Sequence, residues 1–206
     1  MDINFVKQNV LFVGLSDQYA RSVAECIADK LGLYFLDLDQ LIDYSIIDKY
    51  NVKKVCGIKY LEDEEKRVIT SVNDYERTVI SVKYGTFVKY NNIFSEKTLV
   101  VYLKLNHKTL NKLNEKESIN VGINDIIFEE RNKYLKKNCD IVFNCDILNL
   151  ESDLDKLLNE IKGKLSENWT KMYKHGKSGF CWSNSKCKFW SHRGGFVGCN
   201  NFICAF

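Results

Sequence analysis

An α/β fold with a five-stranded parallel sheet is predicted for this chain of 206 residues from the order of its apolar segments. Short continuous apolar runs, typical of strands buried on both faces, alternate with segments whose apolar residues recur at helical spacing. Strands that alternate with helices in this way form parallel sheets covered by helices on both sides. We therefore expect three layers with the sheet in the middle.

The predicted elements follow one another along the chain. The expected strands are residues 10–13, 33–36, 78–82, 99–105 and 141–143. The strand at 99–105 is the clearest, because it contains the apolar run VVYL. Apolar residues at helical spacing predict helices near 23–31, 61–72, 124–137 and 150–161. Gly32 stands where the first helix is expected to end, since glycine readily takes the left-handed conformation found there.

The composition is typical of a soluble globular protein, with 45% apolar and 28% charged residues. The 30 basic and 27 acidic residues leave a net charge of +3, without the concentrated basic patch of nucleic-acid-binding proteins. No apolar stretch approaches the roughly 20 residues of a membrane span. The N-terminus, MDINFVKQNVLFVG, lacks the features of a signal peptide. We therefore expect a cytoplasmic monomer with neither a nucleic-acid nor a membrane partner.

The chain changes character near residue 168. No acidic residue follows Glu167, whereas six lysines and arginines do, and Cys, Gly and Trp become frequent. Neither helical nor strand periodicity is visible there. We therefore expect a folded domain at residues 1–167 and a poorly ordered tail at residues 168–206. A native extension and a frame-shifted one both fit this composition.

The cysteines fall into two groups. Four are expected to be reduced, buried small residues, because the cytoplasm keeps thiols reduced. They are Cys26, Cys56, Cys139 and Cys145. The other four lie in the tail with His192, at the spacing Cys-x5-Cys-x4-His-x6-Cys-x4-Cys. Structural zinc sites use close Cys-x2–4-Cys pairs, so this arrangement matches no common zinc pattern.

Residues 9–39 have the layout of a nucleotide-binding unit, in which an apolar strand, a short loop and an amphipathic helix follow one another. In such units a glycine-rich loop curls its backbone N–H groups around phosphate, and a lysine neutralises charge on the transferred group. The loop here reads GLSDQYARS from Gly14 to Ser22, with no further glycine and no lysine. The sequence predicts a kinase scaffold without the usual phosphate cradle.

Residues 9–161 resemble shikimate kinase, a family of P-loop kinases, at several places along the chain. In that family the first strand ends in Gly-x-x-Gly-x-Gly-Lys-Ser/Thr, and the second ends in Asp-x-Asp followed by an Ile-acidic pair. The second pattern is complete here as Asp37-Leu38-Asp39-Gln40-Leu41-Ile42-Asp43. The spacing from Gly14 to Asp39 is also that of the family. The resemblance implies a P-loop kinase-type fold.

The loop departs from the family at four positions. Asp17 and Tyr19 replace glycines, Ala20 replaces the phosphate-binding lysine, and Arg21 replaces the hydroxyl residue that holds magnesium. Side chains at the glycine positions block close approach of the backbone to phosphate. Alanine cannot neutralise the transferring group, and Asp17 adds negative charge beside it. Arg21 and Ser22 compensate only if the loop shifts.

The substrate side departs from the family as well. Glu62 falls on the arginine that binds the shikimate carboxylate, and a glutamate repels a carboxylate. The triple glycine after the third strand becomes Lys83-Tyr84-Gly85. No arginine lies between Arg77 and Arg131, so the ATP-contacting arginines of the family's lid are absent.

Three residues of the family's acceptor site are kept. The resemblance implies that Asp39 is catalytic and binds substrate, because the corresponding aspartate holds and orients the acceptor hydroxyl. It also implies that Gly85 and Arg131 bind substrate. An alternative is that Asp39 caps the helix after it, while Arg131 pairs with Glu129 or Glu130 on a solvated face.

On the nucleotide side, the resemblance implies that Gly14, Arg21 and Ser22 contact the nucleotide. Asp37 and Ser22 are the expected magnesium ligands, since the first aspartate of the Asp-x-Asp pair supports the metal in the family. The alternative for Asp37 is again a helix cap.

The resemblance implies the family's reaction, in which ATP phosphorylates shikimate to shikimate 3-phosphate in aromatic amino-acid biosynthesis. ATP and Mg²⁺ would be the cofactors of an active enzyme. Because phosphoryl transfer depends on positioning and electrostatics, the altered loop predicts weak or lost catalysis. The alternative is a non-catalytic pseudokinase that binds a metabolite or a protein partner.

Overall fold

The computed structural model describes residues 7–94, 96–116, 124–145 and 150–165. The predicted tail at residues 168–206, with its cysteine cluster, lies outside the described residues.

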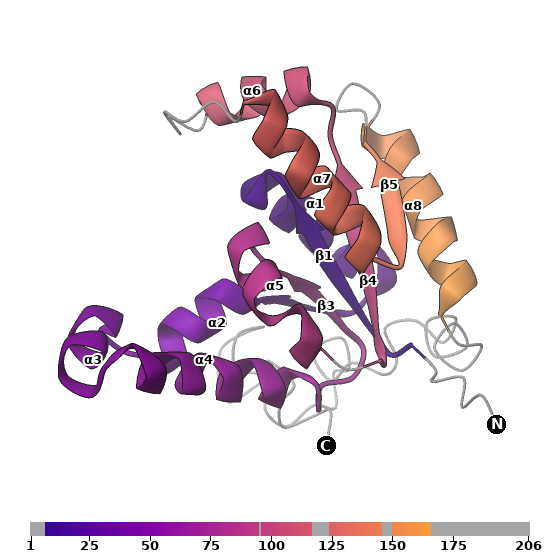
Figure 1. The fold of residues 1–206 in the computed structure, drawn as a ribbon. Coiled ribbons are helices and arrows are strands. Elements are labelled where there is room, and N and C mark those ends of the chain that lie inside the picture. Colours follow the sequence, from indigo (N-terminus) through magenta and orange to yellow (C-terminus); the bar gives the residue numbers. More distant parts are fainter. Residues whose placement is uncertain (1–6, 95, 117–123, 146–149, 166–206) are drawn as a thin grey trace, which may run out of the picture. The chain divides into compact units, whose positions relative to one another are not determined.

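Five parallel strands form one sheet, in the order β2-β3-β1-β4-β5 (Figure 1). They are β1 (Asn9–Gly14), β2 (Tyr34–Asp37), β3 (Thr78–Ser81), β4 (Thr98–Lys104) and β5 (Ile141–Asn144). The central strand β1 places Val10 opposite Val79 of β3 and Leu99 of β4. All six residues of β1 are buried, as expected for a strand covered on both faces.

Helices cover both faces of the sheet. They are α1 (Asp17–Leu31), α2 (Leu38–Ser45), α3 (Lys49–Cys56), α4 (Ile58–Val72), α5 (Tyr84–Tyr90), η1 (Asn91–Ile93), α6 (His107–Lys116), α7 (Asp125–Asn138) and α8 (Leu150–Lys164). Side chains alternate along a strand, and Leu11 and Val13 of β1 share a buried cluster with α2, α4, α5 and α7. On the other side of the sheet, α1 packs along β1, β2 and β3 and contacts α8. Lys30 of α1 and Asp155 of α8 form an ion pair at 3.0 Å.

Every strand and helix predicted from the sequence is present, with ends shifted by a few residues. Gly32 ends α1 in the left-handed conformation, with φ at 64°, as predicted. The short helices α3 and α5 were not predicted, whereas α2 is the helix that the capping alternative placed after Asp37 and Asp39. No described helix is long and apolar enough to span a bilayer.

One prediction about the cysteines is wrong. Cys26 and Cys56 are exposed, because they lie on the outer faces of α1 and α3, whereas Cys139 and Cys145 are half-buried. Burial raises the pKa of the Cys139 thiol to about 12 and that of Cys145 to about 11. All four are free thiols, as predicted.

Candidate functional site

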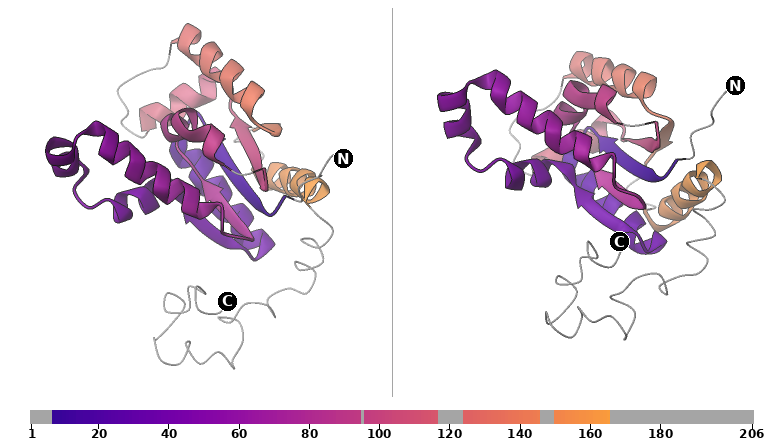
Figure 2. Two further views of the ribbon diagram at one scale, coloured as in Figure 1. Left: turned by 60° about the horizontal axis from the view of Figure 1, so that its bottom comes forward. Right: turned by 90° about the horizontal axis from the view of Figure 1, so that it is seen from below.

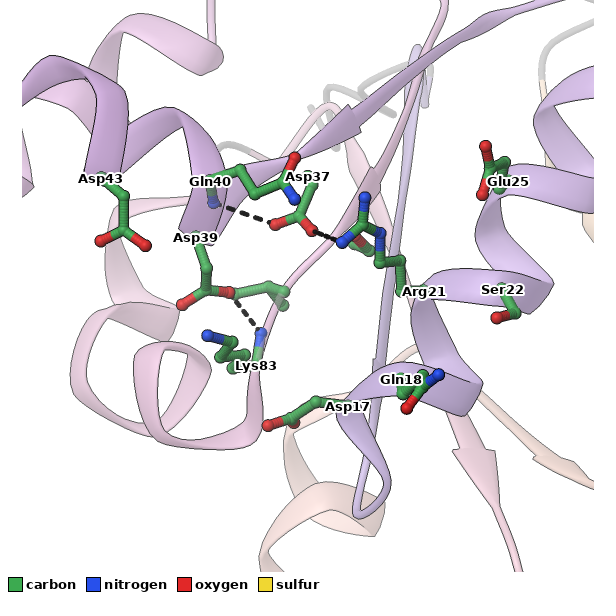
Figure 3. Close-up of a pocket in the computed structure, with 12 residues that line it drawn as sticks. Asp17, Gln18, Arg21, Ser22, Glu25, Asp37, Asp39, Gln40, Asp43 and Lys83 are labelled. Atoms are coloured by element: carbon green, nitrogen blue, oxygen red, sulfur yellow. Dashed lines mark hydrogen bonds and ion pairs between the residues drawn. The ribbon is translucent and has the colours of Figure 1, made fainter. Parts of the chain in front are cut away.

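A cavity of about 620 Å³ lies where β1, β2 and β3 end at their carboxyl termini (Figure 3). Ligands of open α/β sheets bind at this edge of the sheet. The cavity is lined by Asp17, Gln18, Arg21, Ser22, Glu25, Asp37, Asp39, Gln40, Asp43, Ser81, Val82 and Lys83. Five of these side chains are carboxylates and two are basic, so the cavity carries an excess of negative charge.

The first wall of the cavity is the start of α1, which begins at Asp17. Ser16 is its N-cap, and the Tyr19 N–H donates to Ser16 Oγ at 3.3 Å. The Ala20 N–H donates to the Ser16 carbonyl at 3.0 Å. The segment expected to form the phosphate loop is therefore mostly helix, and the N–H groups of Tyr19 and Ala20 donate hydrogen bonds to its N-cap residue, Ser16.

Ala20 does not face the cavity. It is 1% exposed, and a methyl group added to Gly14 would lie 3.3 Å from Ala20 Cβ. Such close packing leaves no room for a long side chain at position 20 in this arrangement. Gly14 lies beneath the cavity at the end of β1 and is not among its lining residues.

Arg21 occupies the middle of the cavity and faces β2 (Figure 3). Its Nη1 lies 3.2 Å from Asp37 Oδ2. Asp37 is also the N-cap of α2, accepting from the Gln40 N–H at 3.0 Å. With the Gln40 amide oxygen turned toward Arg21, that oxygen accepts from Nη1 at 2.9 Å and Nη2 at 3.2 Å. The cation nearest Asp37 is thus a guanidinium of the protein itself.

Asp39 binds the beginning of α5. Its Oδ2 accepts from the Lys83 N–H at 2.7 Å, and its Oδ1 accepts from Thr86 Oγ1 at 2.6 Å. Asp17 supports the same end of α5, accepting from the Tyr84 N–H at 3.1 Å. Asp37 therefore caps the helix that follows it, whereas Asp39 caps a different helix, α5.

A second cavity of about 410 Å³ shares Asp17, Asp39 and Lys83 with the first. Its other lining residues are Ile42, Lys49, Glu65, Gly85, Thr86, Lys89 and Tyr90. A side chain added to Gly85 would meet no atom within 4 Å, so packing does not require this glycine. Gly85 leaves this side of the cavity open.

Lys89, which lines the second cavity, pairs with two carboxylates. Its Nζ lies 3.1 Å from Glu62 Oε1 and 3.1 Å from Glu65 Oε2. Although burial alone would raise the pKa of Glu65, hydrogen bonds from Tyr90 and Lys89 and the charge of Lys89 bring it below its usual value. Burial and the bond to Glu65 raise the pKa of Tyr90 to about 12. A carboxylate ligand must compete with Glu62 and Glu65 for this lysine.

Replacing Lys89 with Met is expected to lower the melting temperature at neutral pH, because Glu62 and Glu65 then lack their shared cation. The lowered pKa of Glu65 stabilises the fold above pH 4.5, its usual value, and this contribution disappears as the pH falls through the folded-state value. The difference from the natural chain should therefore shrink in acid. Calorimetric melting across this pH range measures it, with Lys59→Met as the control, because Lys59 is exposed and forms no ion pair within the described residues. A difference that persists in acid would contradict this account.

Arg131 lies outside both cavities. Its guanidinium carbon stands 4.9 Å from the centre of the Tyr84 ring, and the described residues give it no ion pair with Glu129 or Glu130. The solvated ion pair considered from the sequence is therefore not formed. Arg131 contacts the residue before Gly85, which places it next to the second cavity.

The structure brings most of the predicted site residues together. Arg21, Ser22, Asp37 and Asp39 line the first cavity, and Asp39 and Gly85 line the second. The residues missed from the sequence include Ser81, which is 4% exposed at the cavity floor, and Thr86 and Lys89 on α5. No sequence pattern indicates these three residues, because each reaches the site only when segments distant in the sequence pack together.

The first cavity does not fit a bound Mg²⁺ triphosphate. The N–H groups expected to bind phosphate belong to the first turn of α1. Position 20 is a buried alanine, so no lysine reaches the cavity from there. Asp37 already forms an ion pair with Arg21. No step through ATP or magnesium follows from this geometry.

The model of the family described as shikimate kinase matches residues 21–162. The chain belongs to the shikimate kinase family. The match begins at Arg21, the last of the four altered positions of the phosphate loop, so it rests mainly on the rest of the domain. No curated protein gives a significant match.

Solved shikimate kinases share the fold of this family member. The enzyme of Acinetobacter baumannii, solved with shikimate, has a TM-score of 0.59 and 15% identity, over 77% of this chain and 95% of that one. That of Bacteroides thetaiotaomicron has a TM-score of 0.55 and 18% identity, over 75% and 98%. That of Aquifex aeolicus has a TM-score of 0.55 and 17% identity, over 75% and 96%.

Proposed function

We propose that this protein is a member of the shikimate kinase family with weak or lost phosphoryl transfer. One observation carries the proposal: α1 begins at Asp17, three residues before the position of the family's phosphate-binding lysine. A phosphate loop must leave its N–H groups free for the ligand. Here the N–H groups of Tyr19 and Ala20 serve the helix.

The electrostatics of the cavity support the same proposal. The N-termini of α1, α2 and α5 meet there, and positive helix ends normally favour bound anions. Each of them already has a carboxylate: Asp17 in the first turn of α1, Asp37 on α2 and Asp39 on α5. Carboxylates of the protein itself thus occupy the helix ends where an anion would bind, and they would repel a triphosphate.

Calorimetry with Mg²⁺ and ATP tests the proposal. We expect a dissociation constant weaker than about 1 mM, a binding free energy smaller than about 4 kcal/mol. A coupled ADP-release assay with shikimate should show no turnover above an Asp39→Asn control. Turnover that this substitution abolishes would show that transfer is weakened and not lost, and turnover at the roughly 1–100 s⁻¹ typical of kinases would contradict the proposal.

The second candidate is a slow kinase that uses Arg21, Ser22, Asp37, Asp39 and Arg131. The observation in its favour is that the first four line one cavity. Arg21 would then contact phosphate, for which it must leave Asp37. Turnover lost in both Arg21→Ala and Asp39→Asn would favour this candidate.

A further inference from the structure

Exposed apolar side chains gather at one end of the molecule. The described residues hold nine exposed large hydrophobic side chains, six of which lie in residues 44–60, here called the α3 tip. The six are Tyr44 (81% exposed), Ile47 (83%), Tyr50 (75%), Val55 (81%), Ile58 (50%) and Tyr60 (50%). Single exposed hydrophobic residues are ordinary, but a concentration of them marks an interaction surface.

The α3 tip projects from the rest of the described domain. Helix α3 buries none of its residues and packs chiefly against α4 (Figure 1). The further views show the same helix at the outer end of the α2–α4 arm (Figure 2). Of the tip residues, only Lys49 lines a cavity described above. The six apolar side chains of the tip therefore lie outside both cavities, on the exposed surface of the arm.

The charges of the arm are unevenly paired. Its acidic side chains have cations within the domain: Asp43 with Lys49 at 2.5 Å, Glu62 with Lys89 at 3.1 Å, Asp63 with Lys66 at 3.7 Å and Glu64 with Arg67 at 2.5 Å. Asp48 caps α3 through the Asn51 N–H at 3.1 Å. Lys53, Lys54 and Lys59 have no ion pair in the described part of the chain. Asp48, the one acidic residue of the tip, has no ion pair there either, so three unpaired lysines against one carboxylate leave the α3 tip with a net positive charge.

This charge decides which occupants fit. A second copy would bring the same three lysines against each other, while only Asp48 among the acidic side chains of its tip could pair with them. The chain after Glu167 contains no acidic residue, so it has no negatively charged side chain to pair with the lysines. The complementary surface is anionic. Apart from Lys49, the tip residues line neither cavity, whereas peptides usually dock in a pocket or groove.

We propose that the α3 tip binds the surface of an anionic lipid bilayer. Exposed tyrosine and aliphatic side chains enter the headgroup region, while lysines flank them and contact acidic headgroups. The sequence-based expectation of no membrane partner rested on the absence of a spanning helix. A surface contact through three lysines and six apolar side chains needs no such helix.

Sedimentation of the full chain with phosphatidylcholine vesicles, with and without phosphatidylserine, tests the proposal. Binding should require phosphatidylserine and weaken at high salt. The triple variant Lys53→Glu, Lys54→Glu, Lys59→Glu should bind on the order of a hundredfold more weakly, since each lysine near an anionic surface contributes roughly fivefold. Ile47→Ser with Tyr50→Ser should weaken binding several-fold while leaving its salt dependence unchanged.

Helix α7 offers a matched control. The triple variant Lys133→Glu, Lys136→Glu, Lys137→Glu makes the same charge change on exposed lysines beside Glu129 and Glu130. It should bind vesicles within about threefold of the natural chain, a difference below about 1 kcal/mol. Melting curves check that every variant folds.

Three outcomes would overturn the proposal. One is an absence of phosphatidylserine-dependent binding by the natural chain. Another is an equal loss of binding in the tip and α7 variants, which would show a response to net charge alone. The third is binding to a polyglutamate peptide without binding to vesicles, which would identify an acidic polypeptide as the partner.

Discussion

Restoring the phosphate loop with Asp17→Gly, Tyr19→Gly, Ala20→Lys and Arg21→Ser together is expected to give the protein measurable affinity for Mg²⁺·ATP. The two glycines favour an open loop over the first turn of α1, which frees backbone N–H groups for phosphate. The lysine supplies positive charge, and the loss of Arg21 releases Asp37 for a metal. Calorimetry should show binding at least about tenfold tighter than in the natural chain, a gain of about 1.4 kcal/mol.

The same four substitutions are expected to destabilise the fold. The fourfold variant loses the ion pair between Arg21 and Asp37 and the hydrogen bond from the Tyr84 N–H to Asp17. Each glycine placed within the helix costs roughly 1 kcal/mol. A total of about 2 kcal/mol should lower the melting temperature by roughly 4–8 °C for a domain of this size.

The single variant Ala20→Lys is the control for this prediction. Because Ala20 is buried against Gly14, a lysine there is expected to destabilise the fold without reaching the cavity. It should therefore bind nucleotide no better than the natural chain. Tight binding by this single variant, or low-micromolar binding by the natural chain, would show that α1 rearranges to form a loop.

The sheet could be predicted because its strands carry their own signal. Buried parallel strands read as continuous apolar runs, and all five runs proved to be strands. The long helices were equally visible: Leu61, Val68, Ile69 and Val72, chosen for their spacing, are all buried on α4. The order of strands in the sheet, by contrast, depends on pairings between distant segments.

The short helices could not be predicted from periodicity. Helix α3 buries no residue, so its sequence has no apolar face to recognise. Helix α5 has 7 residues, too few for a helical pattern to repeat. Both nevertheless belong to the candidate surfaces, α5 by binding Asp39 and α3 by forming the exposed tip.

Only part of the candidate site could be predicted from the sequence. The missing glycines and lysine were evident, but the structure that replaced the loop was not. One local signal was available: Ser16 followed by Asp17 is a typical helix start, with a capping hydroxyl and an acidic first turn. The contacts from Arg21 to Asp37 and from Asp39 to Thr86 join residues 16 and 47 positions apart, which sequence patterns do not reveal.

Removing the Tyr102 side chain is expected to have the largest effect on stability. Tyr102 is fully buried in β4, and its hydroxyl hydrogen-bonds to Asn132 of α7, which is also buried. Tyr102→Ala should cost about 3–5 kcal/mol, the range for deleting a large aromatic side chain from a core. Domains have only about 5–15 kcal/mol of stability, so chemical denaturation should show a severely weakened or unfolded protein.

The hydrogen bond itself is separable from the packing of the ring. Tyr102→Phe keeps the ring but leaves the Asn132 amide buried without its partner, which should cost about 1–3 kcal/mol. Adding Asn132→Leu removes that unpaired amide and should recover part of the loss. Tyr44→Phe, on an exposed tyrosine, should change stability by less than about 0.5 kcal/mol.

The Tyr102 bond also bears on the site, because Asn132 is adjacent to Arg131 on α7. If the bond holds α7 against β4, Tyr102→Phe should loosen the contact between Arg131 and the Tyr84 ring, which precedes Gly85. NMR shifts of the Tyr84 ring should then move in Tyr102→Phe as they do in Arg131→Ala, but not in Tyr44→Phe. Unchanged Tyr84 shifts, or a double variant no more stable than Tyr102→Phe, would show that packing of the ring alone fixes α7.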